Sequence, residues 1–199
     1  MIGAPVIFGL TIVVSLLGLY AAPQIIDKAI LRPYRMQRNR EYFRLVSCGF
    51  VHADFAHLAF NMFTFYFFAF AIERTIGTPR FLLLYFTGLI ASSAGTAFNH
   101  RNDPNYASLG ASGAILAVMF AAIVYFPHQK LILLFFPVPI PAPLFAIGYL
   151  AYSFYAARHS KGRINHDAHI AGAITGLIFV ALTNPLQYRE LAGMLGFEG

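Results

Sequence analysis

The chain has no tryptophan, a single cysteine and few charged residues. Charged residues make up 11% of its 199 residues, whereas an average soluble domain carries about 25%. Hydrophobic residues make up 58%, and the mean hydropathy is +0.64. These values exclude a soluble globular domain and a disordered chain. Because Cys48 is alone, an internal disulfide is excluded, and we expect Cys48 to be a small buried residue.

The net charge of +6 does not indicate a nucleic-acid-binding protein. No basic face alternates with stacking aromatic residues in a polar context, so we expect no nucleic-acid partner. In a membrane protein the same excess lies in the loops, where it meets anionic lipid headgroups. No basic residue precedes the first apolar run, which we therefore expect to be a retained span rather than a cleaved signal peptide.

Six apolar segments follow one another along the chain, separated by polar or proline-rich stretches. They run over about 5–26, 54–72, 80–98, 112–126, 138–157 and 166–183. A helix of about 20 residues crosses the hydrocarbon core of a bilayer. We therefore predict an all-α, polytopic membrane protein with six transmembrane helices, forming a single domain over residues 1–199.

The fourth segment is too short to cross a membrane as a straight helix. Its 15 residues extend for about 22 Å, against a hydrocarbon core of about 30 Å. Its first residues are thus expected below the membrane surface. The non-helical backbone that leads into the helix at that depth is tolerated only inside protein or beside a water-filled cavity. The short length therefore predicts a functional site at the start of the fourth segment.

Polar side chains occur near the starts of the second, fourth and sixth segments. They are His57 and Asn61, Ser112, and His169. Alternating spans place these three starts on the same side of the membrane, at similar depth. Since ionisable or strongly polar residues inside spans are costly, we interpret them as one functional site.

Ser112 and His169 have the chemistry of a nucleophile and its base. A serine hydroxyl is a poor nucleophile until a histidine takes its proton. Gly110 and Gly113 flank Ser112 and permit a tight helix entry, and unpaired backbone N–H groups at a helix start suit an oxyanion. Asp167 lies two residues from His169 and faces elsewhere on a helix, so we expect a Ser-His dyad without a carboxylate.

Small residues on the fourth and sixth segments predict how the two polar groups meet. Ala168, Gly172 and Gly176 form one row of small residues, and Gly113 with Ala117 forms another. Such rows allow two membrane helices to approach closely. Packing the rows together brings His169 within reach of Ser112.

Each of these features alone also has a purely structural interpretation. A serine in a membrane helix commonly bonds to a carbonyl one turn back, and a glycine row is commonly only packing. A metal site built from His52, His57, His166 and His169 is a second alternative. A step of five residues turns about 140° around a helix, and no HExxH motif is present, so we expect no metal and no cofactor.

Taken together, the motifs resemble those of the rhomboid intramembrane serine proteases, over about residues 5–183. The family's second-helix motif matches His52, His57 and Asn61; its serine motif matches Gly110, Ser112 and Gly113; its sixth-helix motif matches Ala168, His169, Gly172 and Gly176; and a Glu-Arg pair with a following glycine matches Glu73, Arg74 and Gly77.

The resemblance implies a serine endopeptidase that cleaves single-span transmembrane substrates without metal or ATP. Ser112 would be the nucleophile and His169 the general base. His57 and Asn61, supported by His52 and joined by the Ser112 N–H, would hold the oxyanion. Two departures stand out. Phe43 precedes Arg44 where many members have tryptophan, and Leu116 stands where many have a tyrosine stacked on the histidine, so ring support is absent or comes from elsewhere.

The family topology places both termini in the cytoplasm, and we expect the plasma membrane of a prokaryote. The positive-inside rule gives the opposite orientation, because ten of the fourteen Lys and Arg residues lie after the first, third and fifth segments. We follow the family, since its first loop is a folded, partly embedded element. A non-proteolytic, helix-binding rhomboid-like protein for quality control and a small transporter are the other functional classes.

Overall fold

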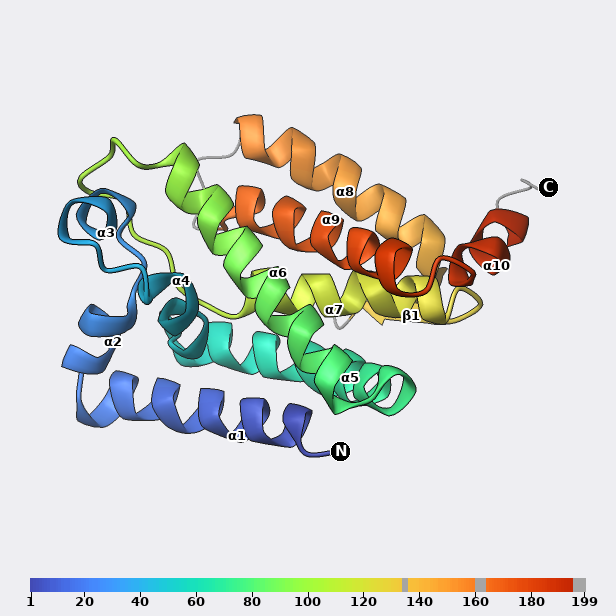
Figure 1. Cartoon of the computed structure of the whole chain (residues 1–199), viewed down its shortest axis with the longest axis horizontal. Helices are drawn as coiled ribbons and strands as arrows, with labels where there is room; N and C mark the ends of the chain where they lie inside the picture. The colour runs from blue at the N-terminus through green and yellow to red at the C-terminus, as the bar shows by residue number, and fades with distance from the viewer. Residues whose placement is uncertain (134–135, 160–163, 195–199) are drawn as a thin grey trace.

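The computed structural model describes residues 1–133, 136–159 and 164–194, and it is helical apart from one short hairpin (Figure 1). The long helices are α1 (Gly3–Leu16), continued by a π-helical turn (Leu17–Ala21), α5 (Phe55–Ile76), α6 (Thr78–Asn99), α7 (Ser112–Tyr125), α8 (Ala142–His159) and α9 (His166–Thr183). The shorter helices are α2 (Gln24–Ala29), α3 (Pro33–Asn39), α4 (Arg44–Ser47), a 3₁₀ turn (Cys48–Phe50) and α10 (Gln187–Met194).

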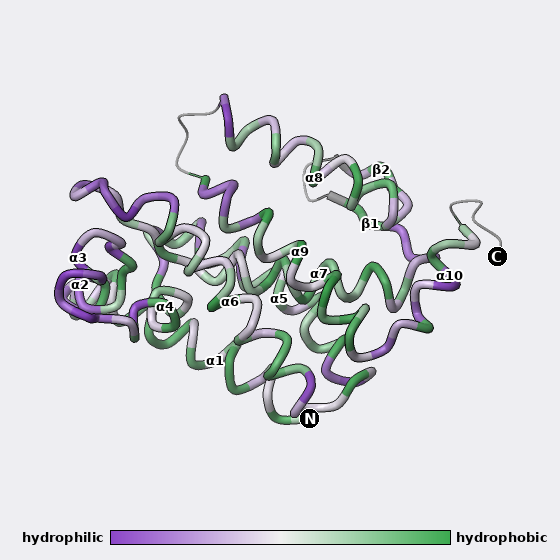
Figure 2. Tube along the Cα trace, turned by 45° about the horizontal axis from the view of Figure 1, so that its top comes forward, coloured by the Kyte–Doolittle hydropathy of each residue, from purple (hydrophilic) through white to green (hydrophobic). Residues whose placement is uncertain are grey.

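Each of the six expected spans corresponds to one long helix. Four described helices are long and apolar enough to cross a membrane, namely 3–21, 55–76, 78–99 and 166–183, and α7 is a shorter apolar helix. The fifth expected span corresponds to α8, which has 18 residues but carries three tyrosines and a basic end that lower its hydropathy. The prediction of an all-α polytopic membrane protein is confirmed. Figure 2 shows hydrophobic residues along the long helices and hydrophilic ones gathered around α2, α3 and α10.

Three predicted boundaries are wrong. The second span does not end at residue 72, because Glu73 accepts hydrogen bonds from the start of α1 and is accommodated within α5, which continues to Ile76. The first span does not continue to residue 26, because the helix ends at Ala21 and α2 starts separately. The fifth span does not begin at residue 138, because residues 136–141 form strand β2 (Phe136–Pro141), antiparallel to β1 (Lys130–Leu133). Three alternating prolines cannot donate to a ladder and suit an edge strand. Two of the ten basic residues counted after the first, third and fifth segments, Lys161 and Arg163, lie outside the described residues.

The helix ends follow from local chemistry. The Asp54 carboxylate accepts the N–H of His57 at 2.7 Å and caps α5. The Asn165 side-chain oxygen accepts the N–H of Ala168 at 3.0 Å and caps α9. Gly77, with φ of +80°, makes the tight turn from α5 to α6. The two caps set the starts of α5 and α9, and they thereby place His57 and His169 in the first turns of these helices.

Helix α7 lies at the centre of the bundle. Every residue from Gly113 to Val124 is buried, which explains why the helix is apolar on all sides. It packs against α5, α6 and α9, and Figure 1 shows α6 crossing it. Small residues permit this contact, since a Cβ on Gly88 of α6 would lie 2.5 Å from the Ala117 side chain. Helix α7 is thus enclosed by protein from Gly113 onward, whereas Ser112 at its start is half-buried.

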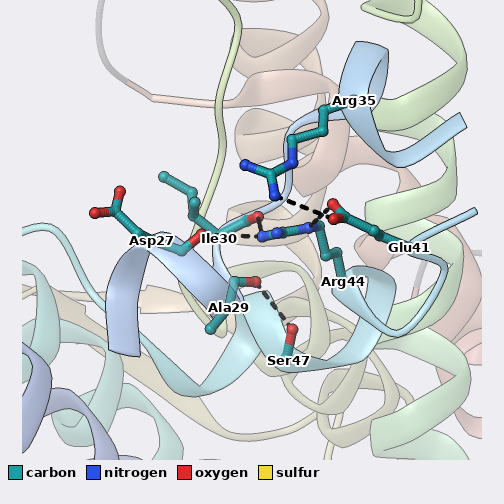
Figure 3. A network of polar contacts seen from close by, with 7 residues as sticks. All are labelled: Asp27, Ala29, Ile30, Arg35, Glu41, Arg44 and Ser47. Atoms are coloured by element: carbon teal, nitrogen blue, oxygen red, sulfur yellow. Dashed lines mark hydrogen bonds and ion pairs between the residues drawn. The ribbon is translucent and has the colours of Figure 1, made fainter. Parts of the chain in front are cut away.

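The connection between the first two spans is a folded element organised by Arg44. This side chain is buried and donates to the Glu41 carboxylate at 2.7 Å and to the carbonyls of Asp27 and Ile30 at 3.1 and 2.8 Å. Figure 3 shows the guanidinium at the centre of this network, with Arg35 also reaching Glu41. The arginine of the Phe43-Arg44 pair therefore ties the short helices together.

Candidate active site

Ser112 and His169 are in direct contact. Oγ of Ser112, the first residue of α7, lies 2.9 Å from Nε2 of His169, in the first turn of α9. Both residues are half-buried. The distance falls within the range that proton transfer between a hydroxyl and a histidine requires.

The close approach of α7 and α9 depends on their small residues. A Cβ on Gly172 would collide with the carbonyl oxygen of Gly113, and a Cβ on Gly176 would collide with that of Ala117. The Ala168 carbonyl lies 3.4 Å from where a Cβ on Gly113 would be. The two rows of small residues thus pack together as the sequence predicts, with their helix backbones touching.

His57 lies beside the turn that precedes Ser112. Gly110 has φ of +110°, and a Cβ there would lie 2.7 Å from Cε1 and 2.9 Å from Nε2 of His57. Only glycine therefore allows the imidazole to sit against this backbone. The arrangement brings the second-span histidine to the entrance of α7, two residues before the serine.

Asn61 lies one turn after His57 on the same face of α5 and is buried. Its Nδ2 donates to the carbonyl of His57 at 2.9 Å. Its Oδ1 has no hydrogen-bond partner in the described part of the chain. The amide is thus held by its own helix through Nδ2.

His52 is not on a helix but in the segment that leads into α5, where it is fully buried. Its Nδ1 lies 2.9 Å from the hydroxyl of Ser15 in α1, and its Nε2 lies 3.5 Å from the N–H of Ala111. Its ring meets that of His57 edge to face, with centroids 4.9 Å apart. His52 therefore links α1, α5 and the residue before Ser112.

Tyr149 of α8 also contacts His169, although no sequence motif marks this tyrosine. Its hydroxyl lies 2.9 Å from Nδ1 of His169, and the two rings are nearly parallel with centroids 6.4 Å apart. Leu116 is buried against α8 and α9 in an apolar cluster. The aromatic partner of the histidine thus comes from α8 rather than from the turn after the serine.

Asp167 turns away from this site, as expected. Its carboxylate accepts from Nδ2 of Asn99 at 3.1 Å and lies 3.9 Å from Nε2 of His100. Among residues 1–133, 136–159 and 164–194, no three His, Cys, Asp or Glu side chains gather into a set that could hold a metal ion. The site consists of a hydroxyl, imidazoles, an amide and a phenol.

Comparison with known proteins identifies the family. A model of the rhomboid domain matches residues 39–185, so this chain belongs to the rhomboid family. It is 32% identical over 161 residues to the RHOMBOID-like protein 12, mitochondrial, of Arabidopsis thaliana, covering 73% of this chain and 47% of that protein. It is 28% identical over 159 residues to the rhomboid protease GlpG of Haemophilus influenzae, covering 80% and 79%.

A third relative is the putative rhomboid protease YdcA of Bacillus subtilis, which is 41% identical over 80 residues, covering 40% of this chain and 39% of that protein. The matches cover about half or less of the length of several relatives, including 40% of the rhomboid protein 1, mitochondrial, of Saccharomyces cerevisiae. The chain is thus an integral membrane protein of a family that includes bacterial proteases.

Proposed function

We propose that this chain is an intramembrane serine endopeptidase that cleaves transmembrane helices with a Ser112–His169 dyad. The observation that carries the proposal is the distance of 2.9 Å between Ser112 Oγ and His169 Nε2, across two helices whose glycines let the backbones touch. Rhomboid-family membership and the similarity to bacterial proteases support it.

The reaction proceeds in two halves. The Ser112 oxygen forms a bond to the carbonyl carbon of the scissile peptide, and its proton moves to Nε2 of His169. The tetrahedral intermediate then releases the amine product, which takes that proton from Nε2, and an acyl-enzyme is left. A water molecule repeats the sequence, giving its proton to Nε2 and its oxygen to the carbonyl carbon, and Ser112 recovers its proton.

The negative oxygen of the intermediate needs hydrogen-bond donors. N–H groups at the start of α7 have no carbonyl partner within the helix and carry partial positive charge. We assign His57, beside Gly110, and Asn61 as the side-chain donors, with His52 supporting them. Because they lie at the start of α7, these donors suit stabilisation of the negative charge on the substrate carbonyl oxygen after attack by Ser112.

Single-span membrane proteins are the proposed substrates, since the site lies at the start of a buried helix within a membrane bundle. We further propose that the protein resides in the plasma membrane of a prokaryote with its termini in the cytoplasm. A non-proteolytic, helix-binding role is the alternative, and it would leave Ser112 chemically inert.

The test uses the full chain reconstituted in lipid with a single-span substrate whose helix contains small and helix-breaking residues. Ser112→Ala and His169→Ala should each abolish cleavage, and only proteins with Ser112 should react with a fluorophosphonate probe. His128→Ala removes an exposed histidine between α7 and β1 and should cleave like wild type. Cleavage by Ser112→Ala at the wild-type rate would contradict the proposal, and substrate binding without cleavage in wild type would favour the alternative.

A further inference from the structure

The imidazole of His169 is held at both nitrogens by different helices. Nε2 lies 2.9 Å from the Ser112 hydroxyl of α7, and Nδ1 lies 2.9 Å from the Tyr149 hydroxyl of α8. A neutral imidazole carries a single N–H, so its two nitrogens play opposite parts. To take the proton of Ser112, Nε2 needs a free lone pair, which puts the N–H on Nδ1.

We infer that Tyr149 is a positioning residue, whose oxygen accepts the Nδ1–H of His169 and thereby holds the base in its active tautomer and orientation. The inference rests on the proposed function. In hydrolases with a triad a carboxylate occupies this place. Here the nearby carboxylate of Asp167 bonds Asn99 instead, so the phenol is the group that faces Nδ1.

The phenol suits a membrane site for an electrostatic reason. A carboxylate buried within the bundle would have to be desolvated as a charge, which is costly in a low-dielectric environment. A tyrosine oxygen accepts the same hydrogen bond without carrying a charge. The site thus gains an orienting acceptor at a much smaller desolvation cost.

Aromatic packing keeps the hydroxyl in place. The Tyr149 ring lies nearly parallel to Phe145, one turn earlier on α8, with centroids 5.7 Å apart. It also meets the fully buried Phe120 of α7, with centroids 6.0 Å apart. A ring held by two helices presents its oxygen with little loss of side-chain entropy on forming the bond.

The first test compares Tyr149→Phe, which removes only the hydroxyl, with Tyr155→Phe, which removes the same atom from an exposed tyrosine of α8. Tyr149→Phe should lower kcat about tenfold, equal to about 1.4 kcal/mol, with KM unchanged. Its Tm should fall by no more than about 5 °C, the loss expected for one hydrogen bond, and Tyr155→Phe should match wild type in both kcat and Tm. A Tyr149→Phe protein with wild-type kcat, or one whose lower rate comes with a raised KM or a larger loss of Tm, would overturn the inference.

The second test reads the tautomer directly and needs no activity. The seven histidines are labelled with ¹⁵N, and the His169 signal is assigned by its loss in His169→Ala. Wild type should show Nδ1 protonated and Nε2 unprotonated, and Tyr149→Phe should show a mixture of tautomers. Protonated Nε2 in wild type would overturn the inference even if the variant fails to fold.

The two proposals fail in different ways. If Ser112→Ala cleaves like wild type, the dyad is wrong, whatever Tyr149 does. If Ser112→Ala is inactive while Tyr149→Phe retains full kcat and the wild-type tautomer, the protease proposal stands and the role of Tyr149 is wrong.

Discussion

Gly172 of α9 packs so closely on Gly113 of α7 that a Cβ on Gly172 would collide with the Gly113 carbonyl oxygen. No side chain fits between the two helices at this height. The contact is one residue from Ser112 and less than one turn from His169, so helix spacing and site geometry are set by the same atoms. Changing the spacing should therefore affect stability and chemistry together.

Gly172→Ala should disturb both. The added methyl group would collide with the Gly113 carbonyl, and overpacking of this kind costs about 1–3 kcal/mol of unfolding free energy. We also expect slower reaction of Ser112 with a fluorophosphonate, because α9 must shift and carry His169 with it. Gly9→Ala, at a position of α1 with nothing within 4 Å, should match wild type or be slightly more stable. Equal melting and labelling of the two variants would refute this account.

Glu73 fastens the start of α1 to the end of α5. Its carboxylate accepts the N–H groups of Gly3 and Ala4 at 2.8 and 2.9 Å and is buried. Glu73→Gln replaces a charged acceptor at a helix N-terminus with a neutral amide, so the free energy of unfolding should fall by about 2 kcal/mol. Exposed Glu190→Gln serves as the control and should change little. Chemical denaturation in mild detergent measures both.

Arg44→Lys tests the folded connection between the first two spans. A lysine cannot reproduce a planar fork that bonds Glu41 and the carbonyls of Asp27 and Ile30 together. We expect faster proteolysis between residues 27 and 50 and a lower Tm. Arg38→Lys changes an exposed arginine of α3 and should behave as wild type. Identical cleavage patterns for the two variants would show that the network is dispensable.

The same network should make stability depend on pH. Hydrogen bonding to Arg44, and then to Arg35, holds the pKa of Glu41 below its ordinary value of 4.5. A lowered folded-state pKa means that the contribution is complete above about pH 4.5 and is lost as the pH falls through the folded pKa. Wild type should therefore melt above Glu41→Gln at neutral pH, and the difference should shrink towards about pH 3. A difference that stays constant with pH would argue against this role of Glu41.

The sequence predicts the long helices and the meeting of Ser112 with His169 because the relevant signals are local or periodic. Caps such as Asn165 mark helix starts, and rows of small residues such as Gly172 and Gly176 mark close packing. The role of Tyr149 leaves no such mark. Three tyrosines lie on α8, and which of them faces α9 depends on how that helix rotates in the bundle.

The hairpin of β1 and β2 was missed for a related reason. Its alternating prolines indicate a break from helix, but they do not say whether the chain turns into a loop or pairs with an earlier segment. Lys130 pairs with Pro141, eleven positions later in the chain. Neither segment alone carries a signal for this pairing. The predicted fifth span therefore began four residues too early.

The single cysteine offers a direct route to the orientation of the protein in its membrane. Cys48 is buried beside Ser93, so the native thiol should give little background with water-soluble maleimides. Asn102→Cys would place one exposed thiol in the turn between α6 and α7. Labelling of intact cells at that position alone would assign this side of the bundle to the exterior, and protection would assign it to the cytoplasm.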